Sequence, residues 1–184
     1  DTTDLTPFAE QVSQVDADLV FVAWAGETAS AMWQSLDQQG ILDSTEVVTG
    51  LDIKPSYPIF GEAGERISFL SHYFDGASDT AVAEIMKDSV EADGGSVDLF
   101  TPDGFTAAQM VVHAASAGDD VQDRISALEG WTFEGAKGEI TIRAEDHALI
   151  QPMYQVELIG QGDEARPELV TEIPAADVEP TVAE

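Results

Sequence analysis

Residues 16–52, DADLVFVAWAGETASAMWQSLDQQGILDSTEVVTGLD, decide how this chain folds. They open with an uninterrupted apolar run, Leu19–Trp24, which predicts a strand buried on both faces, as in the interior of a parallel sheet. A helical pattern follows and ends at Gly40, a position where a left-handed residue commonly terminates a helix. A second short strand at 47–48 completes the pattern. The stretch therefore predicts a βαβ unit within an α/β fold.

The loops that follow these two strands form the predicted binding site. Ligands of open parallel sheets bind outside the carboxyl ends of the strands, so residues 24–27 and 50–52 should share one crevice. The indole of Trp24 would give a ligand a flat apolar wall, and the amides near Gly26 would hold an anionic or carbonyl group. Asp52 would pair with a ligand ammonium. We expect seven ligand-binding residues, the last of them on a later strand: Trp24, Ala25, Gly26, Glu27, Leu51, Asp52 and Tyr73.

Each part of this site also has an ordinary structural role that the sequence leaves open. Trp24 is equally compatible with a tryptophan of the core. The amides after Gly26 are equally compatible with simple helix capping. Asp52 is at least as compatible with an exposed turn aspartate, because Asp is common in turns.

The charge balance of the chain is strongly acidic. Thirty-six Asp and Glu residues stand against seven Lys and Arg residues, which gives a net charge of −29. This charge repels nucleic acid and anionic membrane surfaces and excludes both as direct partners. The acids are spread along the whole chain, and only three residues are lysine. This pattern favours a halophilic source, in which salt screens the self-repulsion.

Length and composition indicate a globular protein of one medium domain or parts of two. The 184 residues are 43% apolar and include no cysteine, which excludes disulfides, thiolate metal sites and cysteine nucleophiles. No apolar segment approaches the roughly 20 residues of a membrane-spanning helix. The chain begins at Asp1 without a signal sequence, so we expect a mature or truncated product.

Catalysis and metal binding have little support in the sequence. His72, His113 and His147 fall on three separate predicted elements, and a structural role is expected for the first two. The acidic cluster at 119–123 lacks the alternating oxygen ligands of a calcium loop. Gly61 and Gly64 are not followed by the lysine of a phosphate loop. We expect no catalytic residue, no metal ion and no cofactor.

Before the central unit, the sequence predicts a helix that begins near Thr6 and carries an apolar stripe at Phe8, Val12 and Val15. A parallel sheet that starts in this way should have a further strand upstream.

After the central unit, a loop at 53–66 leads to a strand at 67–74. Three consecutive helical patterns between residues 78 and 130 break the βα alternation and predict passage into a different lobe. Short strands follow between 131 and 158. We expect the residues from about Gly160 to be extended and partly disordered at the end.

The order of these elements resembles the second half of a type I periplasmic binding protein, most closely the branched-chain amino acid (Leu/Ile/Val) receptors of ABC importers. The resemblance covers nearly the whole chain and rests on weak motifs whose order and spacing are together specific. The motifs are Ala17-Asp18-Leu19-Val20-Phe21, Glu65-Arg66-Ile67, Gly104-Phe105-Thr106-Ala107, Phe133-Glu134-Gly135, Gly138-Glu139-Ile140 and Asp146-His147.

The resemblance implies a fold of two Rossmann-like lobes that close on a ligand. On this basis residues 1–72 form the second-lobe βαβ unit, residues 73–143 a helical segment of the first lobe, and residues 144–184 the return to the second lobe with an acidic tail. The other half of the first lobe, with its contacts to the ligand carboxylate, would be a missing N-terminal half of the same protein.

The resemblance also implies a non-enzymatic, extracytoplasmic receptor that delivers a small amino acid, or a related carboxylate or amide, to an ABC transporter permease. Receptors of this family carry a glutamate near the position of Asp52, whereas the loop at Trp24 usually carries tyrosine, so the ligand stays open. Two alternatives remain: a ligand-sensing domain with the same fold, and an α/β hydrolase-like enzyme. The sequence does not reveal the importer or the oligomeric state.

Overall fold

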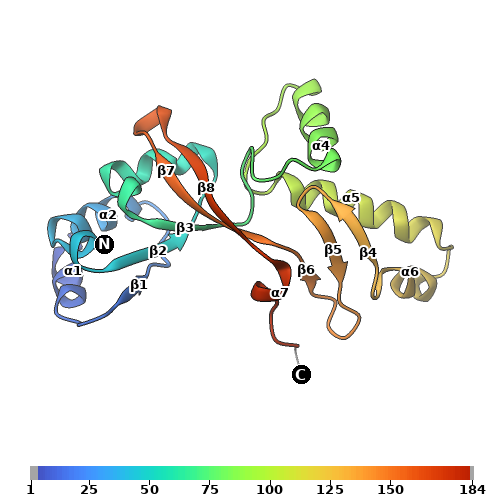
Figure 1. The fold of residues 1–184 in the computed structure, drawn as a ribbon, viewed down its shortest axis with the longest axis horizontal. Coiled ribbons are helices and arrows are strands. Elements are labelled where there is room, and N and C mark those ends of the chain that lie inside the picture. The colour runs from blue at the N-terminus through green and yellow to red at the C-terminus, as the bar shows by residue number, and fades with distance from the viewer. Residues whose placement is uncertain (1–3, 183–184) are drawn as a thin grey trace. The chain divides into compact units, whose positions relative to one another are not determined.

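The computed structural model describes residues 4–182 of the chain. These residues divide into two compact units (Figure 1). Unit 1 comprises the described residues up to Ser71 together with Gln155–Thr171. Unit 2 comprises His72–Tyr154 and the described residues from Glu172 on. The chain therefore passes between the units three times.

Unit 1 is built on parallel strands that alternate with helices, as the central stretch predicts. Strands β1, β2 and β3 pair in parallel, with Phe21 opposite Val48 and Gly50 opposite Leu70. They belong to a five-stranded sheet with the order β1-β2-β3-β7-β8. The elements in chain order are α1 (Thr6–Ser13), β1 (Leu19–Phe21), α2 (Ala29–Gln38), α3 (Ile41–Ser44), β2 (Glu46–Gly50), the 3₁₀ segment η1 (Lys54–Arg66), β3 (Ser68–Ser71), β7 (Met153–Ile159), η2 (Gly162–Glu164) and β8 (Arg166–Ile173).

The first strand differs from its prediction. It ends at Phe21, lies at the edge of the sheet, and leaves Leu19 and Phe21 50% and 67% exposed. The prediction of a strand buried on both faces is therefore wrong for the described structure. The physical reason is that an edge strand has a partner on one side only, whatever the apolarity of its sequence.

Helix α1 also buries less than the sequence predicts. It ends at Ser13, so Val15 lies beyond it and is exposed, as is Phe8. The residues of this segment that are buried are Leu5 and Ala9, which shifts the buried stripe from the predicted one.

Aromatic packing forms the core of unit 1. Trp33 on α2 is 2% exposed, and its ring lies 5.4 Å from that of Phe60 on η1. Phe60 in turn meets Phe69 on β3 edge-to-face at 4.8 Å, an arrangement that aromatic quadrupoles favour. Gly40 has the left-handed conformation (φ 70°) expected at the end of α2, and this conformation turns the chain into α3. These contacts fix α2 and η1 against the sheet.

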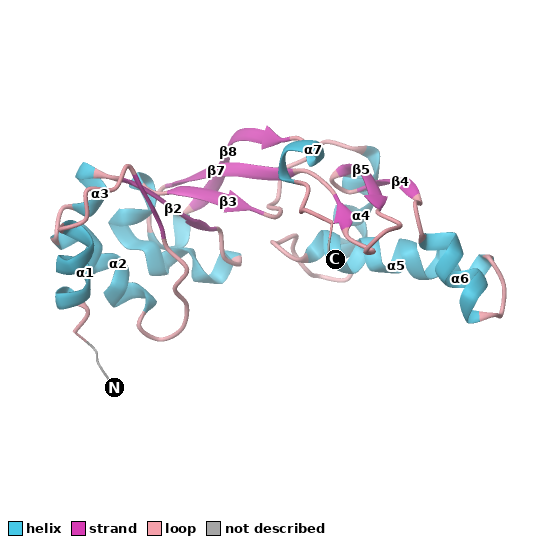
Figure 2. Cartoon of the chain, turned by 90° about the horizontal axis from the view of Figure 1, so that it is seen from below, coloured by secondary structure: helices cyan, strands magenta, loops and turns pink. Residues whose placement is uncertain are grey.

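Unit 2 contains the three consecutive helices that the sequence predicts, followed by a small antiparallel sheet of order β4-β5-β6 (Figure 2). Two of the helices have side-chain caps: the Thr80 hydroxyl accepts the amide of Ala83 at 3.0 Å, and the Asp120 carboxylate accepts that of Gln122 at 2.8 Å. The elements are α4 (Ala81–Ala92), α5 (Thr101–Ser116), α6 (Val121–Leu128), β4 (Thr132–Gly135), β5 (Gly138–Ile142), β6 (Leu149–Ile150) and α7 (Ala175–Val178). No described helix has the length and apolar character needed to cross a membrane.

The described residues after Gly160 include an extended strand, as the sequence predicts, and the predicted disorder at the end of the chain falls partly on residues 183–184, outside the described residues. Residues 166–173 form β8, which pairs at the edge of the five-stranded sheet. Within unit 2, the guanidinium of Arg143 binds the carboxylate of Asp146 through two bonds of 2.8 and 2.6 Å. The same guanidinium donates to the Glu179 carboxylate at 2.7 Å and to the Pro180 carbonyl at 2.8 Å. Arg143 thereby holds the segment after α7.

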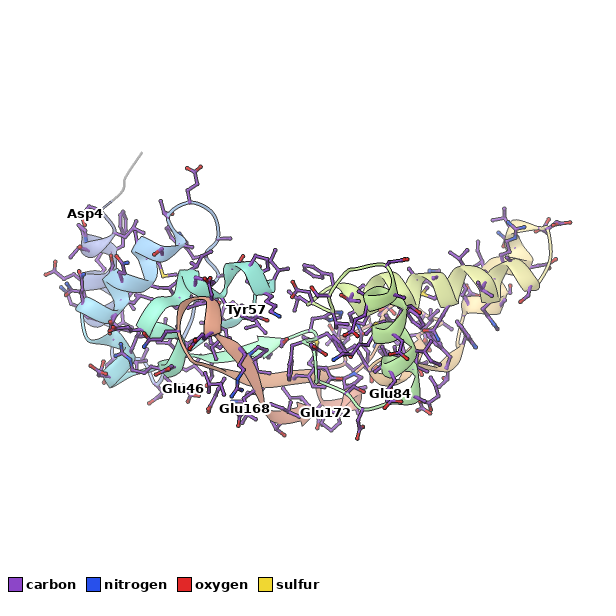
Figure 3. All side chains as sticks on the ribbon, turned by 90° about the horizontal axis from the view of Figure 1, so that it is seen from above. Asp4, Glu46, Tyr57, Glu84, Glu168 and Glu172 are labelled. Carbon is purple, nitrogen blue, oxygen red and sulfur yellow. The ribbon has the colours of Figure 1, made fainter. Side chains whose placement is uncertain are left out.

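Exposed acidic side chains are found on both units. Figure 3 labels Glu46 on β2, Glu84 on α4 and Glu168 on β8, all of them exposed. Exposed carboxylates keep their hydration, so they destabilise the fold mainly through their mutual repulsion.

Candidate functional site

The two predicted loops leave the same edge of unit 1. Strands β1 and β2 are adjacent and parallel, so the segments after Phe21 and after Gly50 both emerge at their carboxyl ends. Two hydrogen bonds extend the pairing beyond β1: the Val22 amide donates to Val48 O at 2.9 Å, and the Thr49 hydroxyl donates to Val22 O at 2.8 Å. The parallel order brings the loops of Trp24 and Asp52 to one edge of one sheet.

Trp24 stands partly free at the start of the first loop. Its side chain is 47% exposed, and its indole Nε1 donates to the Thr28 hydroxyl at 3.0 Å. This hydrogen bond fixes the ring over the beginning of α2. Trp24 is therefore not a core tryptophan, and its exposed aromatic surface is available within unit 1.

The beginning of α2 has a turn conformation that only glycine adopts readily. Gly26 has φ 96°, and its carbonyl accepts the Ala29 amide at 3.0 Å. No side chain caps the helix, and the Thr28 hydroxyl accepts the indole N–H of Trp24. Ala25 and Glu27 lie in the same exposed turn. The amide end of α2 thus carries the partial positive charge of a helix N-terminus without a capping side chain.

The second loop has one buried and one exposed residue. Leu51 is 5% exposed, and its amide donates to Leu70 O at 2.8 Å, which continues the pairing of β2 with β3. Asp52 is exposed, and its Oδ1 accepts the Ile53 amide at 2.7 Å. The hydrogen bond orients the carboxylate at the loop while leaving it accessible to solvent.

Tyr73 lies in unit 2 and is 2% exposed. Its ring meets that of Tyr154 edge-to-face at 6.2 Å. Burial, followed by the negative charge of Asp75, raises the pKa of the Tyr73 phenol. The side chain is thus part of the interior of unit 2.

A shallow apolar groove runs along the free edge of β1 between α1 and α2, with a volume of about 220 Å³. Its walls include Phe8, Val12, Phe21, Trp24, Met32 and Leu36. Three of these side chains, Phe8, Phe21 and Trp24, are more than 40% exposed. The groove lies beside the strand edge and reaches the first predicted ligand loop at Trp24.

The histidines occupy three separate environments. His113 stacks on Trp131 with ring centroids 3.8 Å apart, and its Nε2 lies 3.1 Å from Ala127 O. His147 is exposed and lies 3.2 Å from Glu129. His72 contacts Asp103 and Lys137, as described below. Within residues 4–182, no group of three or more His, Cys, Asp or Glu side chains is arranged to hold a metal ion.

These units and their parallel strands define an α/β protein. The chain belongs to the periplasmic binding protein family, whose model matches residues 1–163. This match confirms the family and the fold class inferred from the sequence. Comparison with curated protein sequences finds no relative that matches this chain.

Solved structures of ABC-transporter solute-binding proteins share this fold. A branched-chain amino acid transporter protein of Rhodopseudomonas palustris is 24% identical with a TM-score of 0.81, over 98% of this chain and 51% of that one. A leucine-, isoleucine-, valine-, threonine- and alanine-binding protein of Brucella ovis is 16% identical with a TM-score of 0.83, over 99% and 50%. A solute-binding protein of R. palustris in complex with p-hydroxybenzoic acid is 18% identical with a TM-score of 0.78, over 95% and 50%. The chain thus spans about half the length of these structures.

Proposed function

We propose that the intact protein is the extracytoplasmic solute-binding component of an ABC importer and has no enzymatic activity. The solute would be a branched-chain amino acid, or a related small carboxylate or amide, bound by lobe closure and delivered to the permease. Family membership and the fold shared with amino acid and aromatic acid receptors support this proposal. The observation that carries it is the pair of loops at the carboxyl edge of β1 and β2, with Trp24 exposed on one and Asp52 on the other.

Each loop would contribute a different part of the recognition. The exposed face of Trp24 would pack against an apolar side chain, and the uncapped start of α2 would favour a carboxylate or carbonyl oxygen. Asp52 would accept a hydrogen bond from the ligand ammonium. In this proposal Ala25, Gly26, Glu27 and Leu51 shape the loops, whereas Tyr73, which is buried within unit 2, has no direct role.

The charge of Asp52 distinguishes two ligand classes. An amino acid has an ammonium that Asp52 would bind, whereas a benzoate-type acid has only a carboxylate, which Asp52 would repel. Replacing Asp52 by asparagine should therefore weaken an amino acid and leave an aromatic acid unchanged or more tightly bound. We favour the amino acid because the carboxylate of Asp52 is solvent-accessible and held in place by a single backbone amide.

Isothermal titration calorimetry of the intact protein tests the proposal, with amino acids and hydroxybenzoates as ligands. Asp52→Asn should weaken amino acid binding by about 1–3 kcal/mol, the scale of a hydrogen bond to a charged group. Glu46→Gln is the matched control, since Glu46 is an exposed acid at the opposite end of β2. Equal affinities in the wild type and Asp52→Asn would remove Asp52 from the site, and the absence of binding by any of these ligands would contradict the proposed solute class.

We further propose that the remainder of the intact protein covers two apolar surfaces of this chain. The first is the groove at the free edge of β1, where Phe21 is 67% exposed. The second is a face of α5 on which Val111 and Val112 are 67% and 70% exposed. Exposed contiguous apolar surface is unusual for a soluble protein and indicates a partner surface. The 184-residue chain alone should bind the dye ANS more strongly than the intact protein does, and equal binding would contradict this proposal.

A further inference from the structure

Three titratable side chains of unit 2 form a row: Asp103, His72 and Lys137. Asp103 Oδ1 lies 2.5 Å from His72 Nε2, and His72 Nδ1 lies 3.4 Å from Lys137 Nζ. Asp103 comes from the first turn of α5, His72 directly follows β3, and Lys137 lies in the turn between β4 and β5. Three elements that are distant in the sequence thus meet at one imidazole.

One tautomer of the imidazole satisfies both of its neighbours as hydrogen-bonding partners. An ionised carboxylate accepts only and an ammonium donates only. With its proton on Nε2, the imidazole of His72 donates to Asp103 and accepts from the nitrogen of Lys137, which has N–H donors both as an ammonium and as a neutral amine.

Lys137 occupies an environment that is unusual for a lysine. Its side chain is almost fully buried, at 4% exposed, and its Nζ lies 5.7 Å from the centre of the Tyr154 ring. Burial lowers the pKa of Lys137 to about 8, and the negative charge of Asp103 opposes part of this shift. The negative charge of Glu172 raises the pKa of Tyr154, and that of Asp75 raises the pKa of Tyr73. Asp75 is itself paired with Lys87 at 2.7 Å.

The row coincides with two places where the chain passes between the units. His72 is the first residue of unit 2 after Ser71, and Tyr154 is the last before the chain returns to unit 1 at Gln155. Lys137 contacts both His72 and Tyr154. We propose that Asp103, His72 and Lys137 form a proton-sensitive anchor that ties the crossing segments at 72–74 and 153–154 to the body of unit 2 and loosens when it binds a proton.

The environment of Lys137 determines how opening of the anchor depends on pH. Opening of the anchor exposes the amine to water, where its pKa returns to the ordinary 10.5 from about 8. The open state therefore binds more protons between these values, and opening becomes less favourable as the pH rises. With these two pKa values, linkage gives an opening constant about tenfold smaller at pH 9 than at pH 7. The inference rests on unit 2 alone and holds whether or not the lobes close on a solute.

Two measurements test the anchor directly. NMR titration of the lysine side chains, with the Lys137 signal assigned by comparison with Lys137→Met, should find Lys137 titrating near pH 8. The Asp103→Asn variant should move that titration to lower pH, because it removes a charge that favours the ammonium. A Lys137 titration at its ordinary value, or one that Asp103→Asn leaves in place, would overturn the proposal.

Native-state hydrogen exchange then reports the opening of the crossing segments. Corrected for intrinsic rates, protection of the amides at His72–Phe74 and Tyr154 should rise about tenfold from pH 7 to pH 9 in the wild type. The rise should disappear in Lys137→Met, a substitution of similar length without the charge. It should persist in Lys87→Met, the control, because Lys87 is a lysine of the same unit at an exposed ion pair. Protection that is independent of pH in the wild type, or equally dependent in Lys137→Met, would refute the anchor.

Discussion

The hydroxyl of Tyr154 gives a sharp test of how unit 2 is packed. The side chain is 0% exposed, and its hydroxyl has no hydrogen-bond partner among the described residues. A buried polar group without a partner carries its full desolvation cost, about 1–3 kcal/mol. Tyr154→Phe removes that hydroxyl and retains the ring that packs on Tyr73, Phe74 and the Lys137 ammonium. We expect the free energy of unfolding to rise by about 1 kcal/mol at pH 7.

The pH dependence of this effect provides a second, independent check. Burial, followed by the charge of Glu172, raises the pKa of Tyr154 above its ordinary value of 10.0. Above pH 10 the unfolded chain loses the phenol proton while the folded chain keeps it, so the wild type loses stability as the pH rises. Linkage puts this loss at about 1.4 kcal/mol at pH 11, and Tyr154→Phe lacks it. The advantage of the variant should therefore be larger at pH 11 than at pH 7.

Urea denaturation at the two pH values measures both effects, provided that the slope m stays constant between wild type and variant. Tyr57→Phe is the control, because Tyr57 in unit 1 has an interaction partner and its hydroxyl is not expected to destabilise the fold. A Tyr154→Phe variant that is less stable than the wild type at pH 7 would refute the argument, since the hydroxyl would then have a partner in solution.

Three further predictions concern the fold and its charge. Arg143→Met should free the segment after α7 from its bonds to Arg143 and make residues 175–180 sensitive to limited proteolysis at native pH; cleavage at the wild-type rate would contradict this role. Gly40→Ala should lower the free energy of unfolding by about 1–2 kcal/mol because of the left-handed φ at Gly40. Gly50→Ala is the control and should lower it less, because Gly50 has no positive φ and no atom near the added Cβ. The melting temperature of the chain, with a net charge of −29, should climb between low and molar potassium chloride as salt screens its self-repulsion, and a flat response would contradict the halophilic interpretation.

The sequence predicts the parts of this fold that local patterns determine. The βαβ unit, the turn at Gly40 and the three helices after residue 78 all follow from periodicity and from glycine chemistry. The exposure of Phe21 does not, because an apolar run indicates only that a strand can be buried. Whether it is buried depends on which strands and helices lie beside it.

Strand β8 is a second element whose pairing the local sequence pattern does not predict. Its sequence is acidic and contains Pro167, a composition that predicts an extended or disordered tail. Pairing at the edge of the sheet nevertheless makes it a strand, and an edge strand tolerates a proline near its first residue. Long-range pairing decides the outcome, and it leaves no local signal.

The candidate sites also differ in how much of their geometry the local sequence patterns predict. That the loops of Trp24 and Asp52 share one edge follows from parallel strand order, which the sequence pattern indicates. The row of Asp103, His72 and Lys137 does not follow, because its members are up to 65 residues apart and meet only through tertiary packing. The one available signal is the scarcity of lysine, which makes Lys137 in a turn between strands a residue to inspect.

The central claim, that a solute binds at the two strand-end loops of unit 1, is tested most directly by tryptophan fluorescence of the intact protein during ligand titration. Of the three tryptophans in this chain, Trp24 is at the proposed site, Trp33 is buried in the core of unit 1, and Trp131 stacks on His113 in unit 2. We expect a ligand-dependent emission change that is lost in Trp24→Phe and kept in Trp131→Phe. A change that persists in full in Trp24→Phe, at unaltered affinity, would contradict this claim.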